Sequence, residues 1–148
     1  MKKEYVYFNK QYERKAERII FVDGICPGAL TDDDIELSHW VPNQTPPQYK
    51  KDTSTEICFS FLEGNDQERF GQVSSNHFDT DGLLAAFTLM YPSIAIRNRD
   101  LLERVSHMGD FGAWQEHKFS VFYDVLASLR RQWKNDGLKS ACFIDIYY

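Results

Sequence analysis

Residues 70–90 read FGQVSSNHFDTDGLLAAFTLM, and the change of pattern within them decides the predicted fold. Residues 70–76 favour a short strand. Residues 82–90 are helix-forming and apolar almost all round, which is typical of a helix buried against a sheet. Pro92 ends this helix. A strand that leads directly into a buried helix is typical of an α/β domain.

The segments on either side extend the same pattern. Their apolar spacing predicts strands at residues 5–8, 18–24, 56–62 and 140–148, and helices at residues 98–108 and 115–133. The helical spacing is that of Leu101, Leu102, Val105 and Met108, and then of Phe119, Phe122, Leu126, Leu129 and Trp133. We therefore expect one α/β domain over residues 1–148, with a mostly parallel sheet flanked by helices.

Residues 26–55 interrupt this pattern. They hold all but one of the five prolines and an acidic run at residues 31–34. We expect a long irregular loop here, and loops of this length are usually functional or disordered.

The composition is that of a folded globular protein, with 43% hydrophobic and 26% charged residues. The formal net charge is -5, and lysines and arginines are spread along the chain, so binding to a nucleic-acid backbone is disfavoured. Cys26, Cys58 and Cys142 lie far apart and are expected to be buried, reduced thiols. No window has the pattern of a signal peptide or a membrane span, so we expect a cytoplasmic protein without a membrane partner.

The stretch HFDTDG at residues 77–82 carries the candidate chemistry. In an extended conformation the side chains of His77, Asp79 and Asp81 point to one side, so they can converge on one ion. An imidazole with two carboxylates suits Mn²⁺, Fe²⁺ or Zn²⁺ better than Ca²⁺. The N-terminus of the helix that follows would favour a bound anion such as phosphate.

The alternative is a structural role for each of these residues. Thr80 or Asp81 would then be the N-cap of the helix, Asp79 a turn residue and His77 a core histidine. Their position favours the metal site, because open α/β sheets bind ligands at the carboxyl ends of their strands.

Asp110 follows a predicted helix, in the stretch SHMGDFG at residues 106–112. It could give the same ion a further carboxylate, or it could be a solvated residue after a helix C-cap at Gly109. His107 could join the site, although a cation near a helix C-terminus is favourable without any chemistry.

Asp23 and His39 are additional candidates. Asp23 ends an apolar strand and precedes a glycine, so it could face the same rim, although a turn residue is the simpler interpretation. His39 lies with Trp40 in the loop at residues 26–55, where both could form a lid over a polar substrate or simply pack the loop down.

Residues 73–86 resemble the first motif of the DHH phosphoesterase superfamily, an HxDxDG sequence at a strand end followed by a helix rich in small residues. In that superfamily the His and both Asp residues contact a dinuclear Mn²⁺ centre that activates water against phosphodiester or phosphoanhydride bonds. The resemblance implies that His77, Asp79 and Asp81 are metal ligands and catalytic residues. It also implies that Asp110 matches the lone Asp of the second motif. The expected ion is Mn²⁺, with Zn²⁺, Fe²⁺ or Mg²⁺ as alternatives, and the expected substrate is a small phosphorylated compound.

The chain departs from that superfamily in lacking an Asp-His-His motif and a C-terminal glycine-rich motif. Its LSHW and DTSTE segments, together with HFDTDG, are also similar to an uncharacterised bacterial family that we place near the superfamily. Either the chain is the front part of a longer protein, or its site has diverged. In the first case the apolar strand at residues 140–148 would border an exposed surface. We then expect a homodimer or aggregation, unless residues 26–55 cover that surface.

Two other functions remain open. Residues 78–84 are similar to the DxDG motif of haloacid-dehalogenase-type phosphatases, in which Asp79 would be the nucleophile and Asp81 the general acid. A non-catalytic α/β binding module with a vestigial metal site is the other alternative.

Overall fold

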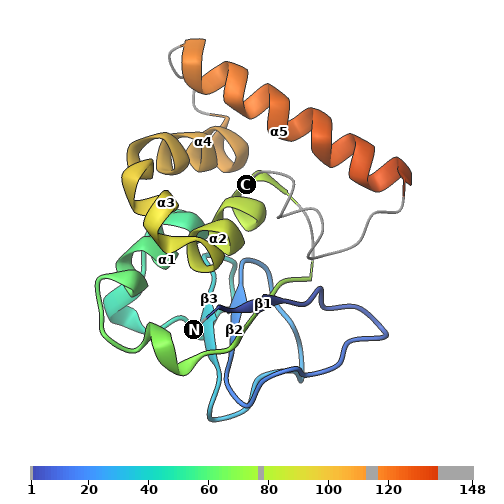
Figure 1. Ribbon diagram of the computed structural model, residues 1–148, viewed down its shortest axis with the longest axis vertical. Coiled ribbons are helices and arrows are strands. Elements are labelled where there is room, and N and C mark those ends of the chain that lie inside the picture. The colour runs from blue at the N-terminus through green and yellow to red at the C-terminus, as the bar shows by residue number, and fades with distance from the viewer. Residues whose placement is uncertain (1, 77–78, 113–116, 137–148) are drawn as a thin grey trace.

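Four short strands form a parallel sheet in the order β1-β4-β2-β3, and helices α1 to α5 pack beside it (Figure 1). This computed structural model describes residues 2–76, 79–112 and 117–136. The strands are β1 (Glu4–Tyr5), β2 (Ile19–Val22), β3 (Ile35–Leu37) and β4 (Gln72–Ser74). The α-helices are α1 (Ser54–Leu62), α2 (Thr80–Met90), α3 (Pro92–Arg97), α4 (Arg99–Phe111) and α5 (His117–Asp136), and short 3₁₀ helices span Pro47–Tyr49 and Gln67–Arg69. The prediction of one α/β domain with a parallel sheet is confirmed.

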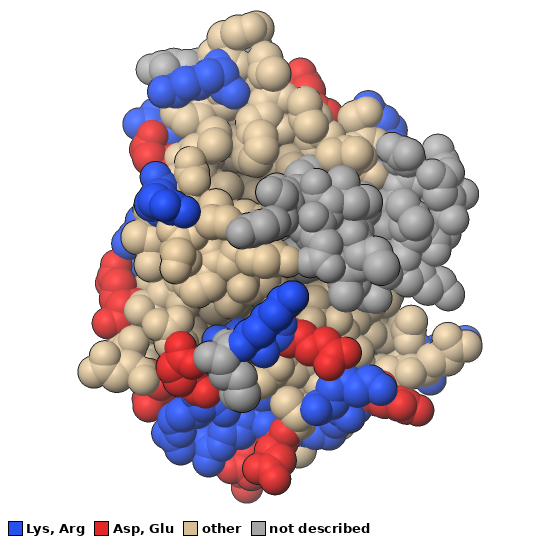
Figure 2. Space-filling model, viewed as in Figure 1, with Lys and Arg blue, Asp and Glu red and all other residues tan. Residues whose placement is uncertain are grey.

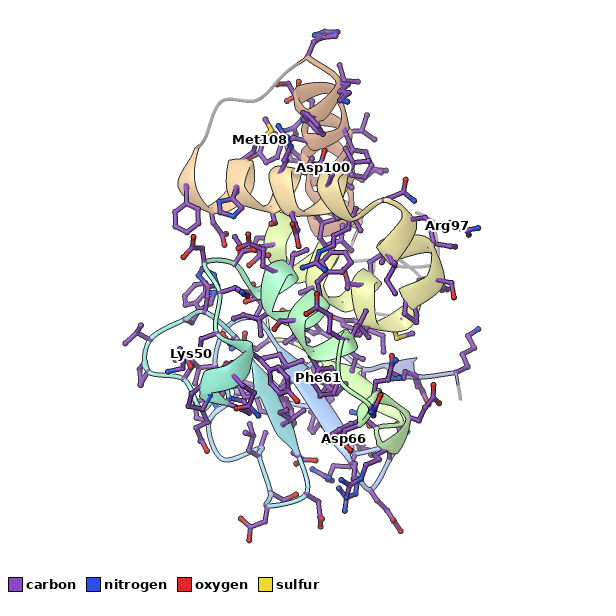
Figure 3. All side chains as sticks on the ribbon, turned by 90° about the vertical axis from the view of Figure 1, so that its left-hand side faces the viewer. Lys50, Phe61, Asp66, Arg97, Asp100 and Met108 are labelled. Carbon is purple, nitrogen blue, oxygen red and sulfur yellow. The ribbon has the colours of Figure 1, made fainter. Side chains whose placement is uncertain are left out.

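The two faces of the sheet are covered differently, as the central strand β2 shows. Ile20 and Val22 point into the main core, which α1 and α2 close. Ile19 and Phe21 point to the other face, where Cys26 and partly buried side chains from the connecting loops cover them. Seen from the side, α1 and α2 lie next to the sheet and α4 and α5 lie farther out (Figure 3).

The prediction of a strand at residues 56–62 is wrong, because these residues belong to α1. The helix begins with a capping box: the Oγ1 of Thr53 accepts from the backbone N of Glu56, and the Glu56 carboxylate accepts from the backbone N of Thr53. The helix is buried on most sides, including Phe59 and Phe61. It therefore lacks the polar face that distinguishes a helix from a buried strand in a sequence.

Residues 26–55 are less irregular than predicted. They contain β3, which pairs with β2 in parallel and forms an edge of the sheet, and the 3₁₀ helix Pro47–Tyr49. A three-residue strand is too short to show an alternating pattern, so only its pairing with β2 identifies it.

Helix α4 ends later than predicted. Gly109 lies inside the helix, and the C-cap is Gly112, with a left-handed φ of 61°. A Cβ at Gly109 would lie 2.9 Å from the Cβ of Thr80, so glycine lets α4 approach the start of α2 closely. The predicted apolar face is confirmed: Leu102 and Val105 are buried in the core.

The remaining expectations are confirmed in part. Helix α5 buries Phe119 and Leu126, and Cys26 and Cys58 are buried free thiols. The predicted strand at residues 140–148, with Cys142, lies outside the described residues.

Among the described helices, none has the length and apolar character needed to cross a membrane. Basic and acidic side chains are interspersed on the face in Figure 2 and form no single basic stripe there.

Candidate metal centre

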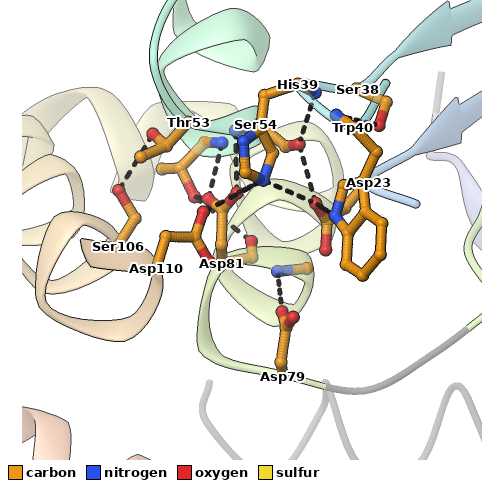
Figure 4. A network of polar contacts seen from close by, with 12 residues as sticks. Asp23, Ser38, His39, Trp40, Thr53, Ser54, Asp79, Asp81, Ser106 and Asp110 are labelled. Atoms are coloured by element: carbon orange, nitrogen blue, oxygen red, sulfur yellow. Dashed lines mark hydrogen bonds and ion pairs between the residues drawn. The ribbon is translucent and has the colours of Figure 1, made fainter. Parts of the chain in front are cut away.

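Three carboxylates from separate parts of the chain, those of Asp23, Asp81 and Asp110, converge on the Nε2 atom of His39 (Figure 4). This atom lies 3.5 Å from Oδ1 of Asp23, 3.5 Å from Oδ2 of Asp81 and 3.0 Å from Oδ2 of Asp110. One ligand atom each from Asp23, His39 and Asp81 lie within 4.8 Å of one another. The spacing is that of groups that could share a metal ion.

Two neighbouring parallel strands bring Asp23 and His39 together. Val22 at the end of β2 pairs with Leu37 at the end of β3. The two loops that follow therefore leave the sheet side by side, at the carboxyl ends of the strands. Asp23 has a left-handed φ of 49°, which aspartate tolerates better than most residues. It is indeed a turn residue, as the simpler interpretation held. Its carboxylate, however, is buried and faces the centre.

Asp23 is held by two further donors. Its Oδ1 accepts from the indole Nε1 of Trp40 at 2.9 Å and from the Oγ of Ser54 at 2.8 Å. The loop after β3 and the start of α1 therefore fix this carboxylate from two sides.

Asp81 is held by the N-terminus of α1. Its Oδ2 accepts from the backbone N of Ser54 at 2.8 Å, and its Oδ1 accepts from the backbone N and the Oγ1 of Thr55 at 2.9 and 2.6 Å. These amides are in the first turn of α1, where they lack partners within the helix. The sequence analysis did not select Ser54 and Thr55. The TSTE capping box at residues 53–56 is the signal that could have placed a helix N-terminus there.

Asp79 borders the centre across Gly82. It is the N-cap of α2, since its Oδ1 accepts from the backbone N of Gly82 at 2.8 Å. A Cβ at Gly82 would lie 2.9 Å from Oδ2 of Asp23 and 3.2 Å from Oδ1 of Asp79. The structural alternative, in which Thr80 or Asp81 caps the helix, is therefore wrong in its choice of residue. The extended conformation expected through residue 81 is also wrong, because α2 begins at Thr80.

Two further residues were predicted for the site, His77 and His107, and the structure describes only the second of them. His77 lies outside the described residues. His107 is part of a separate group, in which its Nε2 lies 2.9 Å from Oε1 of Glu56, with Asp52 nearby. Among the described candidates, the structure thus brings Asp23, His39, Asp81 and Asp110 together, places Asp79 at their border and leaves His107 apart.

The centre has an excess of buried negative charge. The side chains of Asp23 and Asp81 are fully buried, and that of Asp110 is 14% exposed. The carboxylates of Asp110 and Asp23 raise the pKa of His39 to about 10. Burial, with the carboxylates of Asp23 and Asp110, raises the pKa of Asp81 well above its ordinary value.

A single proton on Nε2 of His39 cannot satisfy three carboxylates. It can align with one oxygen at a time, and among the described residues no hydrogen-bond donor is aligned with the buried Oδ2 of Asp110. Clustered buried carboxylates are costly unless cations neutralise them. One imidazole nitrogen with three carboxylates is a mixed ligand set that fits Mn²⁺, Fe²⁺ or Zn²⁺.

Comparison with known proteins identifies a family whose function is unknown. The chain matches one family model over residues 1–147, that of DUF6687, described as a family of unknown function. No curated protein and no solved structure matches the chain.

Proposed function

The chain belongs to DUF6687, a family of unknown function, and from the centre around His39 we propose that it is a divalent-metal-dependent hydrolase of a phosphoester or phosphoanhydride bond. One observation carries this proposal: the carboxylates of Asp23, Asp81 and Asp110 converge on Nε2 of His39. These four residues would hold the ion, with Mn²⁺ as the first choice and Zn²⁺, Fe²⁺ or Mg²⁺ as alternatives.

The reaction class follows from what such a centre can do and where it lies. A bound divalent ion would lower the pKa of a water molecule and neutralise phosphoryl oxygens. Helices α1 and α2 both begin beside the centre, with Ser54 and Thr80 as their first residues. Their first-turn amides hold the carboxylates of Asp81 and Asp79, so a substrate phosphoryl group would be held by the ion and by the positive ends of the helix dipoles. The resemblance of residues 73–86 to the DHH phosphoesterase motif supports the same class of reaction.

Asp79 has a separate role in this proposal. It is half-buried at the border of the centre, and the backbone N of Gly82 fixes one of its oxygens. In this proposal Asp79 would orient the attacking water and accept its proton, which is the work of a general base.

The haloacid-dehalogenase-like alternative has less support. It needs Asp81 to donate a proton to a leaving group, yet Asp81 is fully buried and both of its oxygens accept hydrogen bonds from Ser54 and Thr55. The same contacts favour the second candidate function, a non-catalytic binding module. They would keep Asp81 in place without an ion, so the centre could persist as a structural feature.

The experiment that separates these functions is a hydrolysis panel with added Mn²⁺. The panel contains bis(p-nitrophenyl) phosphate, cyclic dinucleotides, short oligonucleotides and pyrophosphate. We expect turnover by the wild type and loss of turnover in Asp110→Asn, which removes a charge with little change of shape. The matched control is Asp100→Asn, because Asp100 is an exposed acid on the same helix. Bound metal without turnover of any compound would favour the binding module.

A further inference from the structure

A second group of metal-ligating side chains lies outside the centre around His39. Its members are Asp52, Glu56 and His107, and one ligand atom of each lies within 4.8 Å of the others. The Nε2 atom of His107 is 2.9 Å from Oε1 of Glu56. Asp52 is exposed, whereas the side chains of Glu56 and His107 are 21% and 28% exposed. A cation can therefore reach the group from water, and two of its three members are largely shielded.

The start of α1 holds the Glu56 carboxylate in place. Its Oε2 accepts from the backbone N of Thr53 at 3.1 Å, as part of the capping box. Its other oxygen, Oε1, is the one that faces His107. One oxygen therefore fixes the side chain while the other is turned toward the group, and metal-ligating carboxylates are typically supported by hydrogen bonds in this way.

Helix α4 sets His107 against this carboxylate. The imidazole packs against the ring of Phe111, one helical turn further along, with ring centroids 5.4 Å apart. The preceding residue, Ser106, is buried, and its Oγ lies 3.1 Å from Oγ1 of Thr53 in a hydrogen bond that joins α4 to the N-cap of α1 (Figure 4). The spacing of the imidazole and the carboxylate is thus set before any ion binds, which lowers the entropy cost of binding.

The charges within this group do not balance. Two carboxylates face one imidazole, which carries one positive charge at most. A divalent cation in their midst can contact all three side chains at once. Two carboxylate oxygens with one imidazole nitrogen form a ligand set that suits Zn²⁺, and three protein ligands leave the fourth tetrahedral position to water.

We propose that Asp52, Glu56 and His107 form a second divalent-cation site, separate from the centre around His39, with Zn²⁺ as the ion that fits these ligands best. This site does not depend on the proposed hydrolysis, because none of its three residues contributes to the centre.

The place of this second site in the fold gives it a structural role. Asp52 lies two residues before the first residue of α1, and His107 lies on α4, so the ion joins the start of one helix to the other. The same two elements build the centre around His39: the start of α1 holds Asp81, and α4 carries Asp110. An ion in the second site therefore stabilises the docking of α4 that brings Asp110 to the centre.

Zinc content after equilibrium dialysis tests the second site. The wild type should bind two Zn²⁺ ions. Asp52→Asn and Glu56→Gln should each weaken the binding of one ion by at least about tenfold, as the loss of a ligand does, and leave the other ion bound. Glu56→Gln keeps the capping box, because glutamine also serves at that position, and the helix should therefore form as before. Asp100→Asn, a change of an exposed acid on α4, is the control and should bind both ions.

The same variants separate a cation site from a simple ion pair. If His107 and Glu56 only pair with each other, Glu56→Gln will lower the stability of the metal-free protein without changing its zinc content, and the second site is overturned. A single bound ion that depends on Asp110 would also overturn it. Loss of one ion in Asp52→Asn, with wild-type zinc content in Asp110→Asn, would uphold the second site and contradict the centre around His39.

Thermal unfolding with added Zn²⁺ tests the structural role. In Asp110→Asn the centre around His39 has lost a ligand, so the stabilisation that Zn²⁺ still gives comes from the second site. Adding Asp52→Asn to this variant should remove that stabilisation. An equal shift of the unfolding temperature in the single and the double variant would overturn the second site.

Discussion

Oδ2 of Asp110 lies 3.0 Å from Nε2 of His39, so a contact between the last turn of α4 and the loop after β3 closes the candidate metal centre. Asp81 reaches the same atom from the first turn of α2. The centre is therefore a product of tertiary packing, and it depends on how closely α4 docks against α2.

The first prediction concerns the ion itself. Asp110→Asn should weaken Mn²⁺ or Zn²⁺ binding by at least about tenfold, because the loss of a charged ligand or its support typically has an effect of this size. Isothermal titration calorimetry on protein freed of metal with a chelator would measure it. Asp100→Asn should bind the metal as the wild type does. Equal affinities in both variants would show that Asp110 takes no part in metal binding.

The second prediction concerns Gly109, which lies inside α4. In an ordinary helix interior, replacing glycine by alanine is stabilising by about 1 kcal/mol. Here the added Cβ would lie 2.9 Å from the Cβ of Thr80, so α4 must move away from α2. We expect Gly109→Ala to lower the free energy of unfolding by about 1–3 kcal/mol, as overpacking does, and to weaken metal binding through Asp110. Urea denaturation followed by circular dichroism measures the first effect, and an increase in stability would contradict the close approach.

Local sequence patterns were enough for part of the fold. The apolar run around Ile20 predicted the strand β2, and the run from Gly82 predicted the helix α2. In each case the apolar character and the length of the run fit only that type of element. The same reasoning placed residues 56–62 in a strand, since a short helix buried on most sides has no polar stripe. The signal that decides for a helix is the capping box of Thr53 and Glu56, which lies before the apolar run.

The candidate centre was less predictable than the fold. Asp81 and Asp110 were selected from short motifs. Asp23 and His39 were only additional candidates, because nothing local shows that two strand ends are neighbours. The pairing of β2 with the three-residue strand β3 decides this, and such a short strand has no readable alternation. Convergence on His39 is therefore information that only the tertiary structure holds.

The third prediction concerns the hydroxyl of Thr55, which donates to Oδ1 of Asp81 at 2.6 Å. This hydrogen bond lowers the pKa of Asp81 against the larger, opposite effect of burial. Thr55→Val should therefore raise that pKa further and destabilise the protein by about 1–3 kcal/mol, the usual effect of losing a hydrogen bond to a charged group. Metal binding should then begin at a higher pH. Thr55→Ser keeps the hydroxyl and should restore both properties; if it behaves like valine, the hydroxyl is not the cause.

The fourth prediction concerns the pH dependence of stability in the metal-free protein. The carboxylates of Asp110 and Asp23 raise the pKa of His39 from 6.5 to about 10. Between these values the folded protein keeps a proton that the unfolded chain has lost, so the contribution of His39 to stability is full below pH 6.5 and is lost as the pH rises toward 10. The raised pKa of Asp81 acts in the same direction, from its ordinary value of 3.8 upward.

A bound metal should reverse this trend, because the ion competes with the same protons and binds more tightly as they leave. Thermal unfolding between pH 6.5 and pH 9 should thus show falling stability with a chelator present. The difference between metal-loaded and metal-free protein should widen over the same range. His39→Gln removes the titrating group and should flatten the metal-free curve, which distinguishes His39 from the other histidines. A wild-type curve as flat as that of His39→Gln would mean that His39 is not held as a cation among the three carboxylates.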